Sequence, residues 1–158
     1  EREVMEHFRG HYAHTMDSKG RVSLPARYRE VLEANDPSGE KADRVILTHA
    51  LDGNLDLYSL DKWTQFERKL QELPAFKTEV KHIKRVYIGS AKEVSLDSNG
   101  RLLIPKSMRE YADLDREVVW VGQLDKVELW DQGEWESVAA EAQADPEAVQ
   151  EAITELGL

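Results

Sequence analysis

Two arginines, Arg21 and Arg101, occupy positions from which a side chain could do chemistry. Each directly follows an Asp-Ser-x-Gly segment, at residues 17–20 and 97–100. Asp and Ser side chains bond the backbone two residues further on, and Gly accepts a positive φ, so each segment predicts a tight turn. The Asn-Gly pair in the second segment is also a strong hairpin signal. A guanidinium at the mouth of such a turn is well placed to present a positive charge outward.

The acidic residue that opens each turn has two candidate roles. Asp17 and Asp97 each stand four residues before the arginine, so each pair could be a local ion pair that only fixes the turn. Alternatively, the carboxylate braces the turn and leaves the arginine able to bind a partner. The two roles are compatible. The residues that we expect to shape the turns are Asp17, Gly20, Asp97 and Gly100.

The two turns belong to a longer internal repeat. Residues 17–30 and 97–110 share Asp, Ser, Gly, Arg, Pro, Arg and Glu at the same offsets. Each copy predicts a turn, a short apolar strand and a helix. Pro25 or Pro105 suits the first helical position, because the missing N–H of proline would be unpaired there. A duplicated segment implies a duplicated structural unit.

The repeat extends over most of each half of the chain. Apolar strands are predicted at 44–49 and 55–58, and again at 117–121 and 126–130. Between the halves, residues 61–73 have the periodicity of an amphipathic helix, and a second helix is expected at 76–84. Halves of roughly 70–80 residues fold alone only marginally, so we expect them to pack on each other or on other subunits. We interpret the apolar face of the first of these helices as a contact with the core or with another subunit. This face carries Trp63, Phe66, Leu70 and Leu73.

Charge is distributed unevenly along the sequence. The net charge is −10, which at first sight argues against a nucleic-acid partner, but residues 131–158 hold eight acidic side chains and no Lys or Arg. Residues 7–29 hold five basic side chains against one acidic one, and local fields decide what binds. The predicted divisions are a first domain at 7–76, a helical linker at 77–84, a second domain at 85–136 and an acidic helical tail at 137–158. Asp145-Pro146-Glu147 predicts the start of a final helix in that tail.

Several classes of function are disfavoured. The chain has no cysteine, and no stretch approaches the about 20 apolar residues of a membrane span. The spacing of His7, His11 and His14 does not match a zinc signature. We find no nucleophile elbow, phosphate loop, metal triad or carboxylate placed with a base. We therefore expect a cytosolic protein that is not an enzyme, with no metal, cofactor or small-molecule substrate.

The repeated motifs resemble those of the MraZ family over nearly the whole chain up to about Trp135. The resemblance implies an α+β fold of two tandem AbrB/SpoVT-type domains, which are small β-barrels of swapped hairpins packed as a pseudo-dimer, with flanking helices. It is carried by Phe8-Arg9-Gly10, Asp17-x-Lys19-Gly20-Arg21 with Pro25 and Arg29, Leu57-Tyr58, Trp63, Asp97-x-x-Gly100-Arg101-x-x-x-Pro105 and Leu129-Trp130.

The same resemblance implies a function. Family members form ring-shaped homo-oligomers and bind double-stranded DNA at short direct repeats upstream of the division and cell-wall gene cluster. The expectation is a transcriptional regulator, a repressor in its simplest form, that is cytoplasmic and nucleoid-associated. The implied DNA contacts are the two turn arginines. An arginine can bond guanine O6 and N7 together, and a neighbouring lysine would serve phosphate. The predicted DNA-binding residues are Arg21, Arg101, Lys19, Asn99, Arg27 and Lys106.

One departure from the family pattern and the acidic tail keep alternatives open. The lysine at position 19 is replaced by Asn99 in the second copy, so the second turn is expected to contribute less positive charge or to read DNA differently. The acidic tail also suits an antitoxin-like protein-interaction module in which the tail binds a partner. A large ring would favour the regulator, whereas a dimer would favour the antitoxin.

Overall fold

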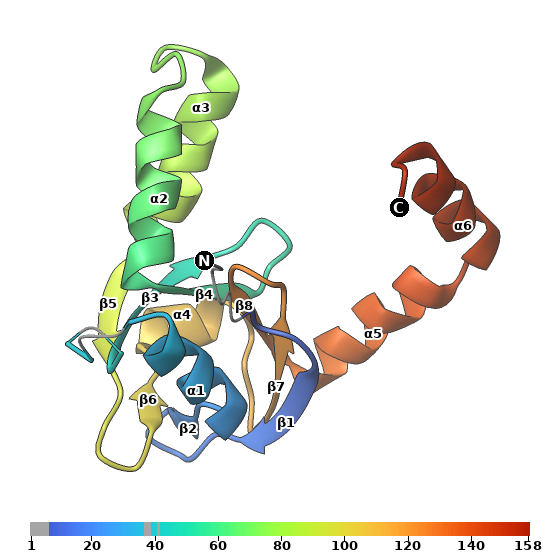
Figure 1. The fold of residues 1–158 in the computed structure, drawn as a ribbon. Helices are drawn as coiled ribbons and strands as arrows, with labels where there is room; N and C mark the ends of the chain where they lie inside the picture. The colour runs from blue at the N-terminus through green and yellow to red at the C-terminus, as the bar shows by residue number, and fades with distance from the viewer. Residues whose placement is uncertain (1–6, 37–38, 41) are drawn as a thin grey trace, which may run out of the picture.

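The order of strands and helices in the first half of the chain is repeated in the second (Figure 1). The computed structural model describes residues 7–36, 39–40 and 42–158. The first half contains β1 (His11–Thr15), β2 (Arg21–Ser23), α1 (Ala26–Ala34), β3 (Arg44–His49) and β4 (Leu55–Ser59). The second half contains β5 (Lys92–Ser95), β6 (Arg101–Leu103), α4 (Lys106–Tyr111), β7 (Glu117–Gly122) and β8 (Val127–Asp131).

The two halves are joined by strand pairing in both directions. The main sheet has the order β1-β7-β8-β4-β3-β5, and its neighbouring strands are antiparallel. β1 therefore pairs with a strand of the second half, and β5 pairs with a strand of the first. A separate two-stranded ribbon consists of β2 and β6, one strand from each half. This exchange of strands confirms the predicted α+β fold with two halves packed as a pseudo-dimer.

The repeated apolar positions meet in one core. Val22 and Leu102 are directly paired between β2 and β6, and both are buried. Tyr28 on α1 and Met108 on α4 are buried at equivalent positions of the two helices. Burial of each such side chain contributes roughly 1.5–3 kcal/mol relative to exposure. The core is thus built from corresponding side chains of both copies of the repeat.

Two of the predicted helix starts are displaced by one residue. Pro25 and Pro105 are not the first helical residues but directly precede α1 and α4. Their φ values of −52° and −56° suit the proline ring, whereas their ψ values of 140° and 145° are extended. The sequence therefore predicted both helices and placed the start of each one residue too early.

A helical hairpin projects from the body between the two halves (Figure 1). It consists of α2 (Leu60–Gln71), α3 (Thr78–Ile83) and a π-helical turn, η1 (Lys84–Ile88). The base of the hairpin is held by Trp63, which is buried with Ile46 and Tyr58. α2 ends before Leu73, which was predicted on its apolar face and is instead 47% exposed.

An arm of two helices leaves the body after β8 (Figure 1). α5 (Gln132–Gln143) packs against the main sheet, because Trp135 and Val138 contact a buried cluster that contains Trp130. α6 (Pro146–Glu155) starts as predicted, with the Asp145 carboxylate accepting a hydrogen bond from the N–H of Ala148 at 3.1 Å. Within the described part of the chain, no helix has the length and apolar character needed to cross a bilayer.

Candidate nucleic-acid interface

The first repeated turn is closed by the carboxylate of Asp17. One oxygen, Oδ1, accepts hydrogen bonds from the backbone N–H groups of Lys19 and Arg21, both at 2.9 Å. The other oxygen, Oδ2, accepts a bond from Nε of the Arg21 side chain at 2.7 Å. Gly20 has a φ of +91°, which an L-residue with a side chain rarely adopts. The turn and the arginine are therefore fixed by the same carboxylate.

The second turn repeats this geometry. The Asp97 carboxylate accepts bonds from the backbone N–H groups of Asn99 and Arg101 at 2.8 and 2.9 Å. Its other oxygen accepts a bond from Nε of Arg101 at 3.0 Å, and Gly100 has a φ of +75°. The local ion pair considered for each turn is thus formed twice.

Both carboxylates remain ionised at neutral pH. The pKa of Asp17 is lowered to about 2, chiefly by the hydrogen bond from the backbone N–H of Arg21, with further contributions from the Arg21 guanidinium and the N–H of Lys19. The pKa of Asp97 is lowered in the same way, first by the backbone N–H of Arg101. The pairs therefore persist over the ordinary range of pH.

Each guanidinium keeps its outer edge available. Asp17 and Asp97 engage Nε, and among the residues that the structure describes the two terminal nitrogens of Arg21 and of Arg101 have no hydrogen-bond partner. The two arginine side chains are 37% and 34% exposed. A carboxylate that holds Nε fixes the direction of the guanidinium while leaving its terminal nitrogens to a partner.

The β2–β6 ribbon brings the two arginines onto one surface. In this ribbon Arg21 is paired with Leu103, and Ser23 is paired with Arg101. Alternate residues of a strand point to opposite faces, and the buried pair Val22–Leu102 defines the inner face. The outer face therefore carries Arg21 and Arg101 at diagonal positions.

Each turn is also supported by a helix from the other half. Nε of Arg109, on α4, donates to the carbonyl of Ile104 at 3.0 Å, and a Cβ built on Gly20 would lie 2.7 Å from that nitrogen. Conversely, Nη1 of Arg29, on α1, donates to the carbonyl of Asn99 at 3.4 Å and packs against Gly100. Glycine at each turn leaves room for this close approach and adopts the positive φ without strain.

Arg29 and Arg109 were not among the predicted site residues. Their recurrence at the same offset in both copies is a signal that they share a role. The sequence could not show that each contacts the turn of the opposite half, because this contact depends on the exchange of strands.

The other predicted DNA-binding residues differ in where they lie relative to the two turn arginines. Lys19 and Asn99 are exposed at equivalent turn positions. Lys106 is the first residue of α4 and lines a groove of about 470 Å³ together with Asp17 and Arg109. Arg27 lies on α1, where its guanidinium is 3.1 Å from the carboxylate of Glu30. Lys19, Arg21, Asn99 and Arg101 thus all lie on the two turns, and Lys106 lies beside the first turn.

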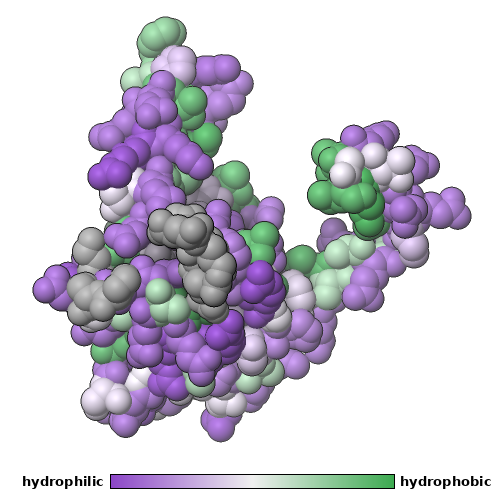
Figure 2. Space-filling view, in the orientation of Figure 1, coloured by the Kyte–Doolittle hydropathy of each residue, from purple (hydrophilic) through white to green (hydrophobic). Residues whose placement is uncertain are grey.

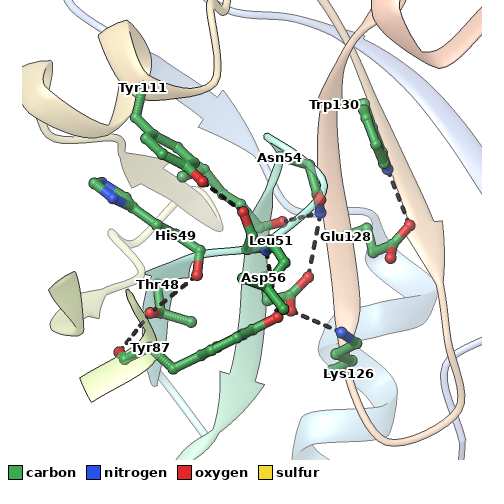
Figure 3. A network of polar contacts seen from close by, with 12 residues as sticks. Thr48, His49, Leu51, Asn54, Asp56, Tyr87, Tyr111, Lys126, Glu128 and Trp130 are labelled. Atoms are coloured by element: carbon green, nitrogen blue, oxygen red, sulfur yellow. Dashed lines mark hydrogen bonds and ion pairs between the residues drawn. The ribbon is translucent and has the colours of Figure 1, made fainter. Parts of the chain in front are cut away.

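A second polar cluster lies at the centre of the main sheet (Figure 3). The fully buried carboxylate of Asp56 accepts bonds from Nζ of Lys126 at 2.7 Å and from Nδ2 of Asn54 at 3.2 Å. Asp56 is paired with Glu128 across β4 and β8, and Glu128 accepts a bond from the Trp130 indole at 2.9 Å. Burial raises the pKa of both carboxyls. Because Asp56 is completely enclosed, this cluster suits a structural role better than one in catalysis.

The amino-terminal histidines are dispersed. The Nδ1 atom of His7 is 4.0 Å from the Asp125 carboxylate, and the ring of His11 lies 6.0 Å from that of Trp135. Across residues 7–36, 39–40 and 42–158, no group of three or more His, Cys, Asp or Glu side chains could hold a metal ion.

Comparison with known proteins gives one consistent result. The family model for the MraZ protein, described as antitoxin-like, matches this chain twice, at residues 7–86 and 87–156. A transcriptional regulator MraZ of Acetivibrio thermocellus is 40% identical over 151 residues, which cover 96% of this chain and 99% of that protein. Proteins of the same name from Pseudomonas putida F1 and Pseudomonas fluorescens SBW25 are 41% and 42% identical over 144 residues, covering 91% of each chain.

Proposed function

The chain belongs to the MraZ family, and we propose that it regulates transcription by binding double-stranded DNA through the outer face of the β2–β6 ribbon. One observation supports this proposal above the others. Two arginines from opposite halves lie on one two-stranded ribbon, and each is held by a carboxylate at Nε with its terminal nitrogens available.

The geometry suits sequence recognition in the major groove. This groove admits a two-stranded β-ribbon, and an arginine can donate two hydrogen bonds to O6 and N7 of one guanine. Because Asp17 and Asp97 already fix the two guanidinium groups, little side-chain freedom remains to be lost on binding. The exposed ammonium of Lys19 is suited to a neighbouring phosphate. Arg21 and Arg101 would thus read bases, while Lys19 would position the turn.

The acidic composition does not conflict with this proposal. The chain carries a net charge of −10, but residues 132–158 alone hold seven carboxylates and no Lys or Arg. In Figure 1 these residues form the arm, which leaves the body away from the ribbon. Electrostatic attraction to phosphate depends on the field near the binding face. An acidic arm on one side and arginines on another allow an acidic protein to bind DNA.

One ribbon provides few contacts, so affinity would depend on repetition. In the proposed assembly, a ring-shaped homo-oligomer presents the ribbon of each copy to one of several short direct repeats. Contacts that are weak individually add through effective concentration when they are linked. We place these repeats upstream of the division and cell-wall gene cluster, where occupancy of the promoter would repress transcription. The protein would then be cytoplasmic and nucleoid-associated.

An antitoxin-like interaction module remains the second candidate. The description of the matching family model and the acidic arm favour it, because such an arm could bind a basic partner protein. We do not propose an enzyme. The Asp56 carboxylate is enclosed, and the carboxylates beside the turn arginines are already engaged by backbone N–H groups and by the arginine Nε atoms.

Binding to DNA across a series of salt concentrations tests the proposal. Direct-repeat DNA from the expected promoter is compared with scrambled DNA, using the wild-type chain, Arg21→Ala and the matched control Arg85→Ala on the helical hairpin. We expect Arg21→Ala to lose about tenfold or more of the specific affinity and Arg85→Ala to retain it. Equal, weak binding of both DNAs that is unchanged in Arg21→Ala would favour the interaction module.

A further inference from the structure

The exposed apolar side chains are concentrated on the two helical projections. Six of the ten large apolar side chains that are exposed among the described residues lie on the hairpin or the arm. On the hairpin, Phe76 is 82% exposed and Leu73 is 47% exposed. On the arm, Leu156 is 73% exposed, and Val149 and Ile153 are also exposed. A patch of this kind on a projecting element indicates an interaction surface.

The terminal helix α6 has an apolar face but lacks a partner for it within the described chain. Val149, Ile153 and Leu156 share one face by their spacing, whereas Glu147, Glu151 and Glu155 lie on the other. Every residue of α6 is exposed. Figure 2 shows hydrophobic residues gathered on one side of the end of this arm. Because an isolated helix of ten residues is marginal in water, we expect packing to stabilise it.

The hairpin offers an apolar surface of the opposite charge. Leu73 and Phe76 lie in the turn between α2 and α3. Residues 68–85, which surround that turn, hold six Lys or Arg side chains and two acidic ones, whereas residues 132–158 hold seven acidic ones and no Lys or Arg. The two projections are therefore complementary in charge and alike in exposing apolar side chains.

We propose that the apolar face of α6 in one copy of this chain packs against the Leu73–Phe76 turn of the hairpin in a second copy. The two surfaces leave the body as separate projections (Figure 1), and α6 is exposed along its whole length, so one chain does not satisfy both. A contact between two different patches is heterologous, and it generates a ring if the rotation closes.

Phe76 is the expected anchor of this contact. Exposed aromatic side chains that become buried carry a large share of interface energy. The charges of the arm and the hairpin would act mainly by steering the encounter, so that association would slow as salt is added. Such a contact extends the proposed function, on which it rests for the biological use of a ring, but it is detectable without DNA.

Disulfide trapping can detect the contact directly, because the chain has no cysteine of its own. Ala75→Cys is placed in the hairpin turn, and Ala152→Cys is placed on the apolar face of α6. When the two single variants are mixed and oxidised, we expect a disulfide-linked pair of chains on a non-reducing gel. Ala152→Cys mixed with the exposed control Ser18→Cys should give little or none. A third sample is the double variant that carries both Ala75→Cys and Ala152→Cys. Equal linkage of Ala152→Cys to the hairpin and control variants, or a disulfide formed only within one chain of the double variant, would overturn the proposal.

Sedimentation velocity of the full chain provides an independent measurement. Phe76→Asp and Ile153→Asp should each raise the concentration at which the assembly dissociates by about tenfold or more, with an unchanged circular dichroism spectrum. The matched control Leu51→Asp, at a position that is 67% exposed, should leave the assembly intact. A monomer at all concentrations, or an assembly unaffected by Phe76→Asp, would contradict the proposed contact.

The two proposals fail separately. Loss of the assembly in Phe76→Asp with retained, Arg21-dependent binding to a single DNA box would support the hairpin–arm contact and leave the DNA-binding face intact. Trapped pairs of chains without Arg21-dependent DNA binding would support the contact and reject the proposed function. DNA binding without any trapped pair would reject the contact alone.

Discussion

The first and second turns share their internal bonds and differ in what surrounds them. Asp17 and Asp97 each accept two backbone hydrogen bonds and one from an arginine Nε. Outside these bonds, exposed Lys19 is replaced by Asn99. On the ribbon, Ser23 of the first half corresponds to Leu103 of the second. The bonds that form the turn have been kept in both copies, while the surface beside them has diverged.

The centre of the sheet shows the same kind of divergence with a different consequence. In the repeat, residues 55–58 correspond to 127–130, so that Asn54 corresponds to Lys126 and Asp56 to Glu128. The two acidic residues face each other across β4 and β8. If position 126 were asparagine, as position 54 is, the carboxylates of Asp56 and Glu128 would lie side by side without a cation. Lys126 supplies that cation, and its Nζ lies 2.7 Å from the Asp56 carboxylate. Here the asymmetry serves the fold rather than the binding face.

Replacing Lys126 with the residue of the first half is expected to have the largest effect. Lys126→Asn leaves the Asp56 carboxylate buried without its ion pair, which costs about 3 kcal/mol of the free energy of unfolding. Urea denaturation at neutral pH measures this change. The matched control, Asp56→Asn with Lys126→Asn, removes both charges and should recover most of the loss. Equal losses in the single and double variants would show that the ion pair is not the source.

The pH dependence of Lys126→Asn provides a check on the same mechanism. Burial raises the pKa of Asp56 even with the lysine present, and removal of the ammonium should raise it further. A carboxyl whose pKa is higher in the folded state favours folding when protonated, so stability is gained as pH falls. The deficit of the variant should therefore shrink between about pH 7.5 and about pH 5. A deficit that is constant with pH would point to lost packing instead.

The two turn arginines are expected to contribute unequally to DNA binding. Arg21→Ala should reduce the affinity for direct-repeat DNA by about 30-fold, and Arg101→Ala by less, about fivefold. The reason is that the first turn carries the exposed Lys19, whereas the equivalent position of the second turn is the uncharged Asn99. Parallel titrations of the two variants against the same DNA measure the difference. Equal losses would mean that the two turns bind alike despite their surroundings.

Substitutions that exchange Lys19 and Asn99 should change the salt dependence of DNA binding more than the affinity itself. Lys19→Asn removes one phosphate contact, so the slope of log affinity against log salt should become shallower by about 0.9 per turn engaged. Asn99→Lys should make it steeper by about the same amount. The double exchange should leave the slope near that of the wild type. An unchanged slope in Lys19→Asn would show that this lysine does not face phosphate.

The sequence predicted the repeated parts well because they are local. The Asp-Ser-x-Gly turns, the short strands that follow them and the start of α6 at Asp145-Pro146 each follow from neighbouring residues. The support of Gly20 by Arg109 could not be predicted, because the two residues belong to different halves. The Asp56–Lys126 pair was missed for the same reason, since it depends on the pairing of β4 with β8. What the sequence lacked was the way in which the two halves exchange strands.

The smallest expected effect is the change in the pKa of Asp17 when the Arg21 side chain is removed. The pKa of Asp17 is about 2, below its ordinary value of 3.8, and the hydrogen bond from the backbone N–H of Arg21 is the largest single cause of that shift. A lowered carboxyl pKa stabilises the folded state above the ordinary pKa, and this contribution is lost as pH falls from about 4 through about 2. The turns should therefore be unaffected by pH between about 5 and 8.

An NMR titration of the Asp17 carboxyl in Arg21→Ala tests this account. The backbone N–H remains in this variant, so the Asp17 carboxyl should still have a pKa below 3.8, with Asp97 unchanged as the internal control. A return to the ordinary value would show that the side chain holds the turn, and loss of DNA binding in Arg21→Ala would then reflect a lost turn rather than a lost contact.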